Sequence, residues 1–453
     1  MNKAIASSIP NTEHRIPDSG RSITANRIFT MTDVDGGVGV AGMLERCFVN
    51  IAGGEILSVS KKPEFDNVTD YGDEYDILPG MINAHAHLEL SQLKSPIDFS
   101  GNSSANLSVQ NSHGNNSLGN NSIGNNSLGK DSIVEDFLIQ KFVVQKGCYD
   151  FVQWIRRLVE FRCSFDYDSV VAISDAKCYF ASSGETAAVV DIFPFGLNPS
   201  QLDIGKGVEW LRYPELIAWD SGVVGRKIEL ICGLCKDYYS GLSPHAPHTV
   251  SAELVEFAAG FGVGISMHLA ESPDEMRLLK SRDGRLAEMM RKVDENYDPA
   301  KVLLGNRAMD YLQVLSRAPS VLIIHGNYLD DEEIRFLAKH NETMAVVYTP
   351  RSHDYFGFDE FPLQKMLDVG VCVLLGTDSK ASTPDLNLSN EIIHAASIYP
   401  QVPREIFFQM ATIKSAKFLN LTKNYGTIEA GKKAVFTKIP NCLSNRLACT
   451  HYT

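Results

Sequence analysis

Histidines and carboxylates stand at the ends of apolar runs in this chain, a pattern suited to metal-assisted hydrolysis. His85 and His87 are two residues apart, so on a β-strand both side chains point to the same face. An imidazole nitrogen is a good ligand for zinc or a similar divalent ion. Because a lone H-x-H pair recurs by chance, this pair alone gives only weak support for a metal site.

Three later apolar runs also end on a polar residue. His268, His325 and Asp378 close these runs, and Glu271 lies three positions after His268. A single buried histidine is usually a hydrogen-bonded core residue. Four runs that all close on His or Asp are hard to explain in that way. The pattern therefore favours one site assembled from several strands.

A scaffold of parallel strands must position these residues. From residue 77 onward, short apolar runs alternate with helical patterns, which is typical of repeated βα units. The eight expected strands lie near residues 77–84, 186–192, 214–218, 227–243, 263–268, 321–325, 343–348 and 371–376. Helices are expected over residues 147–162, 251–260, 274–291, 331–340 and 361–369. Eight such units predict an α/β fold, a (β/α)8 TIM barrel with its active site at the carboxyl ends of the strands.

The remaining segments predict a second, smaller domain. Residues 25–76 alternate apolar runs with turns, and together with residues 426–453 they are expected to form a small composite β-sandwich. The barrel is expected over residues 77–425, and residues 1–24 are expected to be flexible. The Asn/Ser/Gly repeat at about residues 100–132 is too poor in apolar residues to offset its ordering entropy. It predicts a disordered loop, with an active-site lid as the alternative.

Composition narrows the class of protein. Hydrophobic residues make up 44% and charged residues 21%, which is ordinary for a globular enzyme. A formal charge of −13 argues against nucleic acid as a partner. The sequence shows no apolar signal core and no run of about 18 apolar residues, so we expect a cytoplasmic protein without a membrane partner. Nine dispersed cysteines do not predict a disulfide framework, and Cys232 and Cys235 are interpreted as two buried thiols.

Several segments together resemble a known family. They are PGMINAHAHL, SSGETAAVVDI, SPHAPHTVS, HLAES, IHGNYL, TPRSHDYF and LLGTDSKAS. They are similar to the amidohydrolase superfamily, in its cytosine/adenosine deaminase-like and chlorohydrolase-like branch. The resemblance runs from the hairpins near residue 50 to Gly431. Beyond it, Lys433-Ala434 replaces the Ala-Asp usual in relatives, which puts the last strands of the small domain in doubt.

The resemblance implies one divalent metal ion. It assigns the ligands as His85, His87, His268 and Asp378. No lysine closes the expected fourth strand, where relatives with two metals carry a carboxylated one, so a single ion is favoured. Zn²⁺ is the first expectation and Fe²⁺ the alternative.

The same resemblance implies a proton-transfer system. Zinc can lower the pKa of a bound water to about 7, and Asp378 would accept the proton of that water. Glu271 would protonate a ring nitrogen of the substrate and later pass a proton to departing ammonia. His325 would stabilise the attacking hydroxide and the tetrahedral carbon that forms. The alternative for Glu271 is a solvated acid opening a helix.

Further residues are expected to contact the substrate: His245, Glu89, Arg351 and His353. His245 is assigned through the resemblance, and Ser352 is expected to line the pocket with its neighbours Arg351 and His353. For Glu89, a helix-initiating acid is an equal alternative. Asp191 and Glu215 are expected at the ends of the second and third strands, where buried hydrogen bonding is as good an explanation as a role in the site. The role of His248 is open.

The predicted function is hydrolytic deamination of an aminated purine or nucleoside derivative. The segments HAHLELS and FVQWI resemble aminodeoxyfutalosine deaminases of menaquinone biosynthesis. The alternatives are a chlorohydrolase, an S-adenosylhomocysteine or methylthioadenosine deaminase, and an imidazolonepropionase-like hydrolase of cyclic amides. A non-catalytic barrel homologue would lack a ligand or the acid, and all are present here. The expected partner is a small-molecule substrate, and the sequence leaves a homodimer open.

Overall fold

The computed structural model describes residues 19–32, 42–97, 150–164, 168–197, 207–233 and 239–441. The repeat near residues 100–132, the segment 1–18 and Cys235 lie outside these described residues. Cys232, expected to be a buried thiol, is exposed. Within the described ranges, no helix has both the length and the apolar composition needed to cross a membrane.

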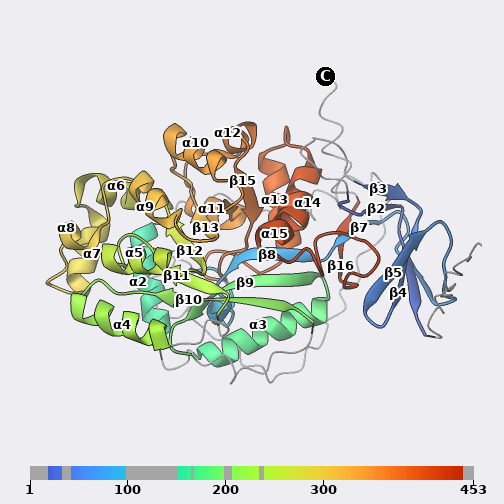
Figure 1. The fold of residues 1–453 in the computed structure, drawn as a ribbon, viewed down its shortest axis with the longest axis horizontal. Helices are drawn as coiled ribbons and strands as arrows, with labels where there is room; N and C mark the ends of the chain where they lie inside the picture. The colour runs from blue at the N-terminus through green and yellow to red at the C-terminus, as the bar shows by residue number, and fades with distance from the viewer. Residues whose placement is uncertain are drawn as a thin grey trace, which may run out of the picture.

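An eight-stranded parallel sheet forms the centre of the molecule (Figure 1). In order across the sheet, its strands are β8 (Met81–Ala86), β9 (Thr186–Pro194), β10 (Glu209–Leu216), β11 (Gly241–Pro244), β12 (Gly264–Leu269), β13 (Val321–His325), β14 (Met344–Tyr348) and β15 (Cys372–Leu375). A parallel bridge between Ala86 and Asp378 brings the two ends of the sheet together. The sheet is thus a nearly closed barrel, and the predicted (β/α)8 fold is confirmed.

Helices lie between and around the barrel strands (Figure 1). They are η1 (Leu88–Leu90), α2 (Phe151–Arg162), α3 (Ser169–Ser183), α4 (Ser221–Gly233), α5 (Ala252–Gly260), α6 (Pro273–Ser281), α7 (Arg285–Val293), α8 (Pro299–Val302), α9 (Ala308–Leu315), α10 (Asp331–Lys339), α11 (Pro350–Phe356), α12 (Leu363–Asp368), α13 (Leu388–Ile398), α14 (Arg404–Ala411) and α15 (Ile413–Phe418).

The continuous apolar character of the strands follows from burial on both faces. Alternate residues such as Leu322 and Ile324 of β13 pack together inside the barrel. Their neighbours Val321 and Ile323 belong to the larger core that the surrounding helices cover. Both faces exclude water, so these strands show no alternation of apolar and polar residues.

Two expected elements differ in the structure. The fourth expected strand, residues 227–243, is wrong in its first part, where α4 occupies Ser221–Gly233. Val224 and Ile231 are buried there and lie seven residues apart, which is the spacing of one helix face. The expected helix over residues 274–291 is two helices, because Gly284 adopts φ +112° between α6 and α7.

Two four-stranded sheets lie beside the barrel, at the right of Figure 1. One contains β1 (Arg21–Thr24), β4 (Phe48–Ala52), β5 (Glu55–Ser60) and β6 (Val68–Asp70). The other contains β2 (Arg27–Phe29), β3 (Met43–Glu45), β7 (Tyr75–Pro79) and β16 (Phe436–Pro440). The first strand starts at Arg21, inside the segment expected to be flexible. The last strand, β16, forms despite the unusual Lys433-Ala434 that precedes it.

Barrel closure depends on close backbone approach at Gly376. A Cβ at this position would lie 2.9 Å from the Cβ of His85 and 3.0 Å from the His85 carbonyl oxygen. We therefore expect Gly376→Ala to lower the free energy of unfolding by about 1–3 kcal/mol through overpacking. Urea unfolding measures this loss. Gly225→Ala is the control, because nothing lies within 4 Å of its added Cβ on helix α4; equal losses in both variants would contradict the prediction.

Candidate active site

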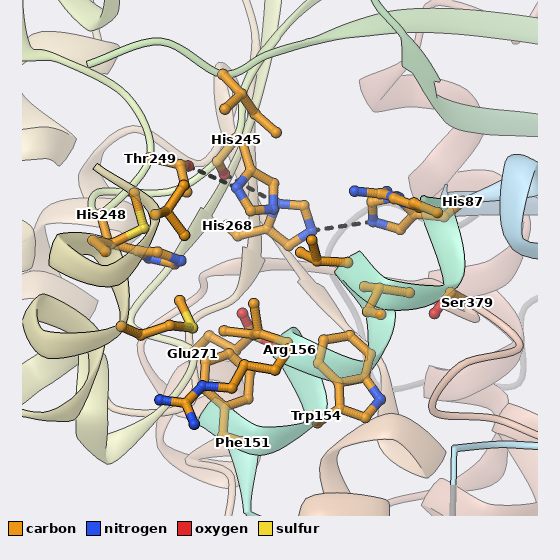
Figure 2. Close-up of a pocket in the computed structure, with 18 of the residues that line it drawn as sticks. His87, Phe151, Trp154, Arg156, His245, His248, Thr249, His268, Glu271 and Ser379 are labelled. Carbon is orange, nitrogen blue, oxygen red and sulfur yellow. Dashed lines mark hydrogen bonds between the residues drawn. The ribbon is translucent and has the colours of Figure 1, made fainter. Parts of the chain in front are cut away.

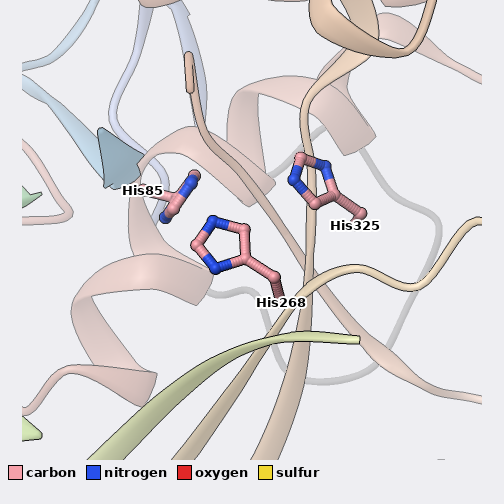
Figure 3. Close-up of side chains that lie close together, drawn as sticks. All are labelled: His85, His268 and His325. Carbon is pink, nitrogen blue, oxygen red and sulfur yellow. The ribbon is translucent and has the colours of Figure 1, made fainter. Parts of the chain in front are cut away.

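Histidines from three strands converge at the carboxyl end of the barrel. His85, His268 and His325 come from β8, β12 and β13, and their rings face one another in Figure 3. The ring centroids of His85 and His268 are 5.0 Å apart, and those of His268 and His325 are 5.5 Å apart. His87 follows β8, and its Nε2 lies 3.3 Å from Nε2 of His268. Two nitrogens bound to one tetrahedral zinc ion would be roughly 3.3 Å apart at Zn–N distances of about 2.0–2.1 Å. The separation of the His87 and His268 nitrogens therefore suits two ligands of one ion.

Asp378 adds a carboxylate to this cluster. Its Oδ1 lies 3.5 Å from Nε2 of His85 and 3.9 Å from Nε2 of His87. Its Oδ2 accepts hydrogen bonds from Oγ of Ser352 at 2.6 Å and from Oγ of Ser382 at 3.1 Å. Burial alone would raise the pKa of Asp378, but the surrounding imidazoles hold it well below its usual range. One oxygen is therefore occupied by the serines, and the other faces the histidines.

The donor atoms fit a divalent cation. The two ring nitrogens of His85 and Nδ1 of His87 are buried, with no hydrogen-bond partner among the described residues. Buried polar atoms are normally satisfied, and a cation in the cluster would satisfy Nε2 of His85, which faces Asp378. Nδ1–H of His268 donates to the His245 carbonyl at 3.0 Å, which leaves the Nε2 lone pair free to bind a metal. His85 belongs to both candidate ligand groups in the described chain, one with His268 and His325 and one with His87 and Asp378.

Strained backbone turns direct several of these side chains. Ala270, His325 and Asp378 have φ values of +55°, +68° and +61°. Non-glycine residues rarely adopt this left-handed region, which costs of order 1–3 kcal/mol per residue. All three follow or end a barrel strand, so the chain turns sharply where it passes the cluster of candidate metal ligands.

Glu271 and His325 form an acid–imidazole pair beside the cluster. Oε1 of Glu271 lies 3.3 Å from Nε2 of His325, whose Nδ1 is 3.1 Å from Oγ1 of Thr349. Burial raises the pKa of Glu271 well above its ordinary value, and the negative charges of Asp378 and Glu275 raise it further. Burial also lowers the pKa of His325 to about 3. The pair therefore combines a carboxyl group that holds its proton with a neutral imidazole, as general acid chemistry requires.

A cavity of about 390 Å³ opens over these residues. Figure 2 shows His87, His268 and His245 on one side and helix α2, with Phe151 and Trp154, on the other. Its apolar lining comprises Leu90, Phe151, Trp154, Ile155, Leu158, Val159, Ile217, Trp219, Met289, Met290 and Val293. Such walls suit a flat ring whose polar edge meets a few converging polar groups.

The structure brings His245 to the cavity, together with His248. Nδ1 of His245 lies 2.7 Å from Oγ1 of Thr249, and its Nε2 lies 3.7 Å from Oε1 of Glu215. Burial lowers the pKa of His245 to about 3 and that of His248 to about 3. Both rings are therefore neutral hydrogen-bonding groups at the cavity wall.

The other three expected substrate contacts lie elsewhere. Glu89 is buried in an ion pair with Arg162, and of these two only Arg162 lines the cavity. Arg351 is buried, with its Nε 2.6 Å from Oε1 of Glu391. His353 does not line the cavity either, and its Nδ1 is 3.5 Å from Oδ1 of Asp354. Burial and ion pairing make Glu89 and Arg351 parts of the scaffold.

Other important contacts have no distinctive sequence signal. Ser352 was grouped with its neighbours in the sequence, but it alone of the three touches Asp378. Asp191 is buried and accepts hydrogen bonds from the Leu88 amide at 3.1 Å and from Nε1 of Trp210 at 3.0 Å. Burial raises the pKa of Asp191 to about 8. Its contacts anchor the backbone next to His87, which a lone aspartate in an apolar strand could have suggested.

Comparisons with known proteins find a family model and relatives that match part of this chain. Residues 227–444 match the amidohydrolase family model, and the resemblance predicted from the sequence is confirmed over that part of the chain. A 5-methylthioadenosine/S-adenosylhomocysteine deaminase of Moorella thermoacetica is 34% identical over 204 residues, which cover 43% of this chain and 42% of the relative. An aminodeoxyfutalosine deaminase of Deinococcus radiodurans is 31% identical over 188 residues, covering 38% and 43%. The chain thus matches less than half the length of these two curated relatives.

A solved structure shares the fold over most of the chain. It is an atrazine chlorohydrolase of Arthrobacter aurescens TC1 complexed with zinc. The TM-score is 0.63, the identity is 18%, and the match covers 93% of this chain and 87% of that chain. At this identity the likeness concerns the fold.

The hydroxyl of Ser352 should tune metal binding through Asp378. Ser352→Ala removes a 2.6 Å hydrogen bond that orients the carboxylate. We expect affinity for Zn²⁺ to fall roughly 10–100-fold, as for other losses of support to a metal ligand. Competition with a chromophoric chelator measures it on metal-stripped protein. Ser389→Ala is the matched control, because that buried hydroxyl has no hydrogen-bond partner among the described residues; equal affinities in the two variants would refute the role.

His248 should make the fold acid-sensitive. Burial lowers its pKa to about 3, from the ordinary histidine value of 6.5. The unfolded chain therefore binds a proton that the folded chain resists, and stability falls as pH drops from 6.5 toward 3. His248→Gln should remove up to about 1.4 kcal/mol of this loss per pH unit. Urea unfolding of the metal-free wild type and variant at several pH values tests this. If the unfolding free energies of the two proteins fell in parallel as the pH dropped, His248 would not be the cause.

Proposed function

We propose that this protein is a metal-dependent hydrolytic deaminase that acts on an aminated purine or nucleoside derivative. The observation that carries the proposal is the Glu271–His325 pair, which lies beside the metal-ligand cluster in an apolar-walled cavity. A protonated carboxyl group next to a metal site can deliver a proton to a ring nitrogen and then to a departing amine. We further propose a cytoplasmic setting, supported by the free cysteines of the described chain.

We assign one divalent metal ion to the cluster. His85, His87, His268 and Asp378 would hold it, with Zn²⁺ preferred for its affinity for imidazole and carboxylate ligands and Fe²⁺ as the alternative. When bound, such an ion would supply a water molecule acidic enough to act as a nucleophile near neutral pH. His325 lies within reach of the same cluster, but its 3.3 Å contact with Glu271 favours a role in catalysis.

The side chains divide the proton transfers between them. Oδ1 of Asp378 faces the cluster and can accept the proton of the attacking water, because Ser352 and Ser382 occupy only Oδ2. Glu271 donates its proton to a ring nitrogen of the substrate, then takes the remaining proton of the attacking water and passes it to the leaving amine. The proton held by Asp378 finally returns to Glu271, which restores both carboxyl groups. The neutral His325 ring holds the attacking oxygen as charge develops. The apolar wall formed by α2 excludes bulk water, which strengthens these interactions.

The sequence relatives narrow the substrate class. Methylthioadenosine, S-adenosylhomocysteine and aminodeoxyfutalosine all carry an aminated purine, and the names of the two relatives above refer to these substrates. His245 would contact the ring as a neutral hydrogen-bonding group, and the apolar walls would contact its faces. A chlorohydrolase is the second candidate, favoured by the fold it shares with the zinc-containing neighbour.

An ammonia-release screen tests the proposal directly. The protein is purified without chelator, its metal content is determined by elemental analysis, and it is assayed with Zn²⁺ or Fe²⁺ added. The substrates are aminodeoxyfutalosine, adenosine, methylthioadenosine, S-adenosylhomocysteine, guanine, cytosine and a chlorotriazine. Ammonia from a purine nucleoside supports the proposal. Chloride release alone would favour the second candidate, and no bound metal with no activity would reject both.

Two variants separate metal binding from proton transfer. Glu271→Gln keeps the side-chain shape but removes the transferable proton, so we expect the metal content to stay and kcat to fall at least about 100-fold. His268→Ala removes a ligand, so we expect the bound metal to be lost. Elemental analysis and ammonia release measure the two effects. Full activity in Glu271→Gln would show that another group transfers the proton.

A further inference from the structure

Glu275 lies outside the cavity lining but is bound to the backbone of Glu271. Its Oε1 accepts the Ala270 amide at 2.7 Å, and its Oε2 accepts the Glu271 amide at 3.3 Å. Only 1% of Glu275 is exposed. A buried carboxylate is costly unless charge-assisted hydrogen bonds satisfy it. Two backbone amides supply those bonds here, and both belong to the turn that carries Glu271.

The carbonyl groups of Ala270 and Glu271 are hydrogen-bonded as well. Nδ2 of Asn327 donates to the carbonyl oxygen of Glu271 at 2.8 Å, and the Tyr328 amide donates to the carbonyl oxygen of Ala270 at 3.0 Å. Asn327 is itself 6% exposed. The backbone of Glu271 therefore makes hydrogen bonds through its N–H and its C=O, to side chains from two different barrel units.

This arrangement counteracts a conformational strain. Ala270 has φ +55°, which an alanine adopts only when its surroundings enforce it. Without the Glu275 carboxylate, the Ala270 amide loses its hydrogen-bond acceptor and the turn can relax. Relaxation would move the Glu271 side chain away from His325, which it now approaches at 3.3 Å.

We propose that Glu275, with Asn327, is a positioning residue that clamps the Glu271 peptide and so aims its carboxyl group at His325 and the substrate. This inference rests on the proposed role of Glu271. It assigns Glu275 no contact with substrate or metal. Glu275 affects catalysis only by fixing the backbone conformation of Glu271.

The chain provides a matched control for this clamp. Glu333 is 1% exposed, and its two oxygens accept the Met309 and Asp330 amides, each at 2.9 Å. It completes the capping box of helix α10 with Asp330, and its Oε1 also lies 3.6 Å from Nε of Arg307. Neither Glu333 nor the two residues whose amides it accepts line the cavity. Glu275→Gln and Glu333→Gln thus remove the same type of interaction, because a glutamine amide can accept only one of the two N–H groups. Any general loss of stability should appear in both variants.

The test compares these variants in kinetics and in hydrogen exchange. For Glu275→Gln we expect kcat to fall roughly 10–100-fold while KM changes less than about threefold, since small misplacements of a catalytic group have effects of this size. Bound metal should be unchanged. Amides of the peptide spanning residues 269–272 should exchange faster than in wild type. Glu333→Gln should retain wild-type kcat and wild-type exchange in that peptide.

Each other outcome counts against the clamp. A kcat within about twofold of wild type would overturn it, and so would a loss of bound metal, which would assign Glu275 to the metal-ligand cluster. If Glu275→Gln does not fold, Asn327→Ser replaces it with the same expectations. If wild type deaminates no purine, the proposed function fails separately. Hydrogen exchange then decides the clamp alone, and unchanged exchange at residues 269–272 overturns it.

Discussion

The meeting of the first and last barrel strands is the constraint on which the site depends. The amides of Thr377 and Asp378 donate to the His85 carbonyl at 3.0 and 3.1 Å, and Asn83 bonds Thr377 from the same strand. These contacts bring together residues nearly 300 positions apart in the sequence. Two histidines and one carboxylate converge only because the barrel closes here, and Gly376 leaves room for it to do so.

Closure also explains the electrostatics of the site. Five histidines and two carboxyl groups gather in a space that burial removes from water. Desolvation lowers the pKa of His87, His245, His268 and His325 and raises that of Glu271, while the neighbouring imidazoles hold the pKa of Asp378 well below its usual range. The two carboxyl groups therefore differ in charge although both are buried. Opposite environments for two neighbouring acids are a common way to separate the roles of acid and base.

The sequence predicted the barrel well because strand burial leaves a direct signal. Seven of the eight strands were placed within a few residues, since apolar runs such as 321–325 cannot lie at a surface. The fourth failed because α4 carries apolar residues such as Leu230 and Ile231 near its end, and an apolar count does not separate them from the strand that follows. The histidine and aspartate cluster was predictable because its members stand at strand ends. Arg351 and Glu89 were not, because ion pairing with Glu391 and Arg162 is a property of the fold and leaves no local pattern.

Helix α11 shows how much the site depends on rotational phase. Arg351, Ser352 and His353 are consecutive, and each successive side chain on a helix is rotated by roughly 100°. Arg351 therefore faces Glu391 in an ion pair, and Ser352 faces the carboxylate of Asp378. His353 lies against aromatic rings that include Phe361. Inserting one residue before this helix would turn the guanidinium of Arg351 toward Asp378, and deleting one would place the imidazole of His353 there instead. Among variants of this chain, the length of the segment between β14 and α11 is thus as strictly constrained as the identity of any ligand.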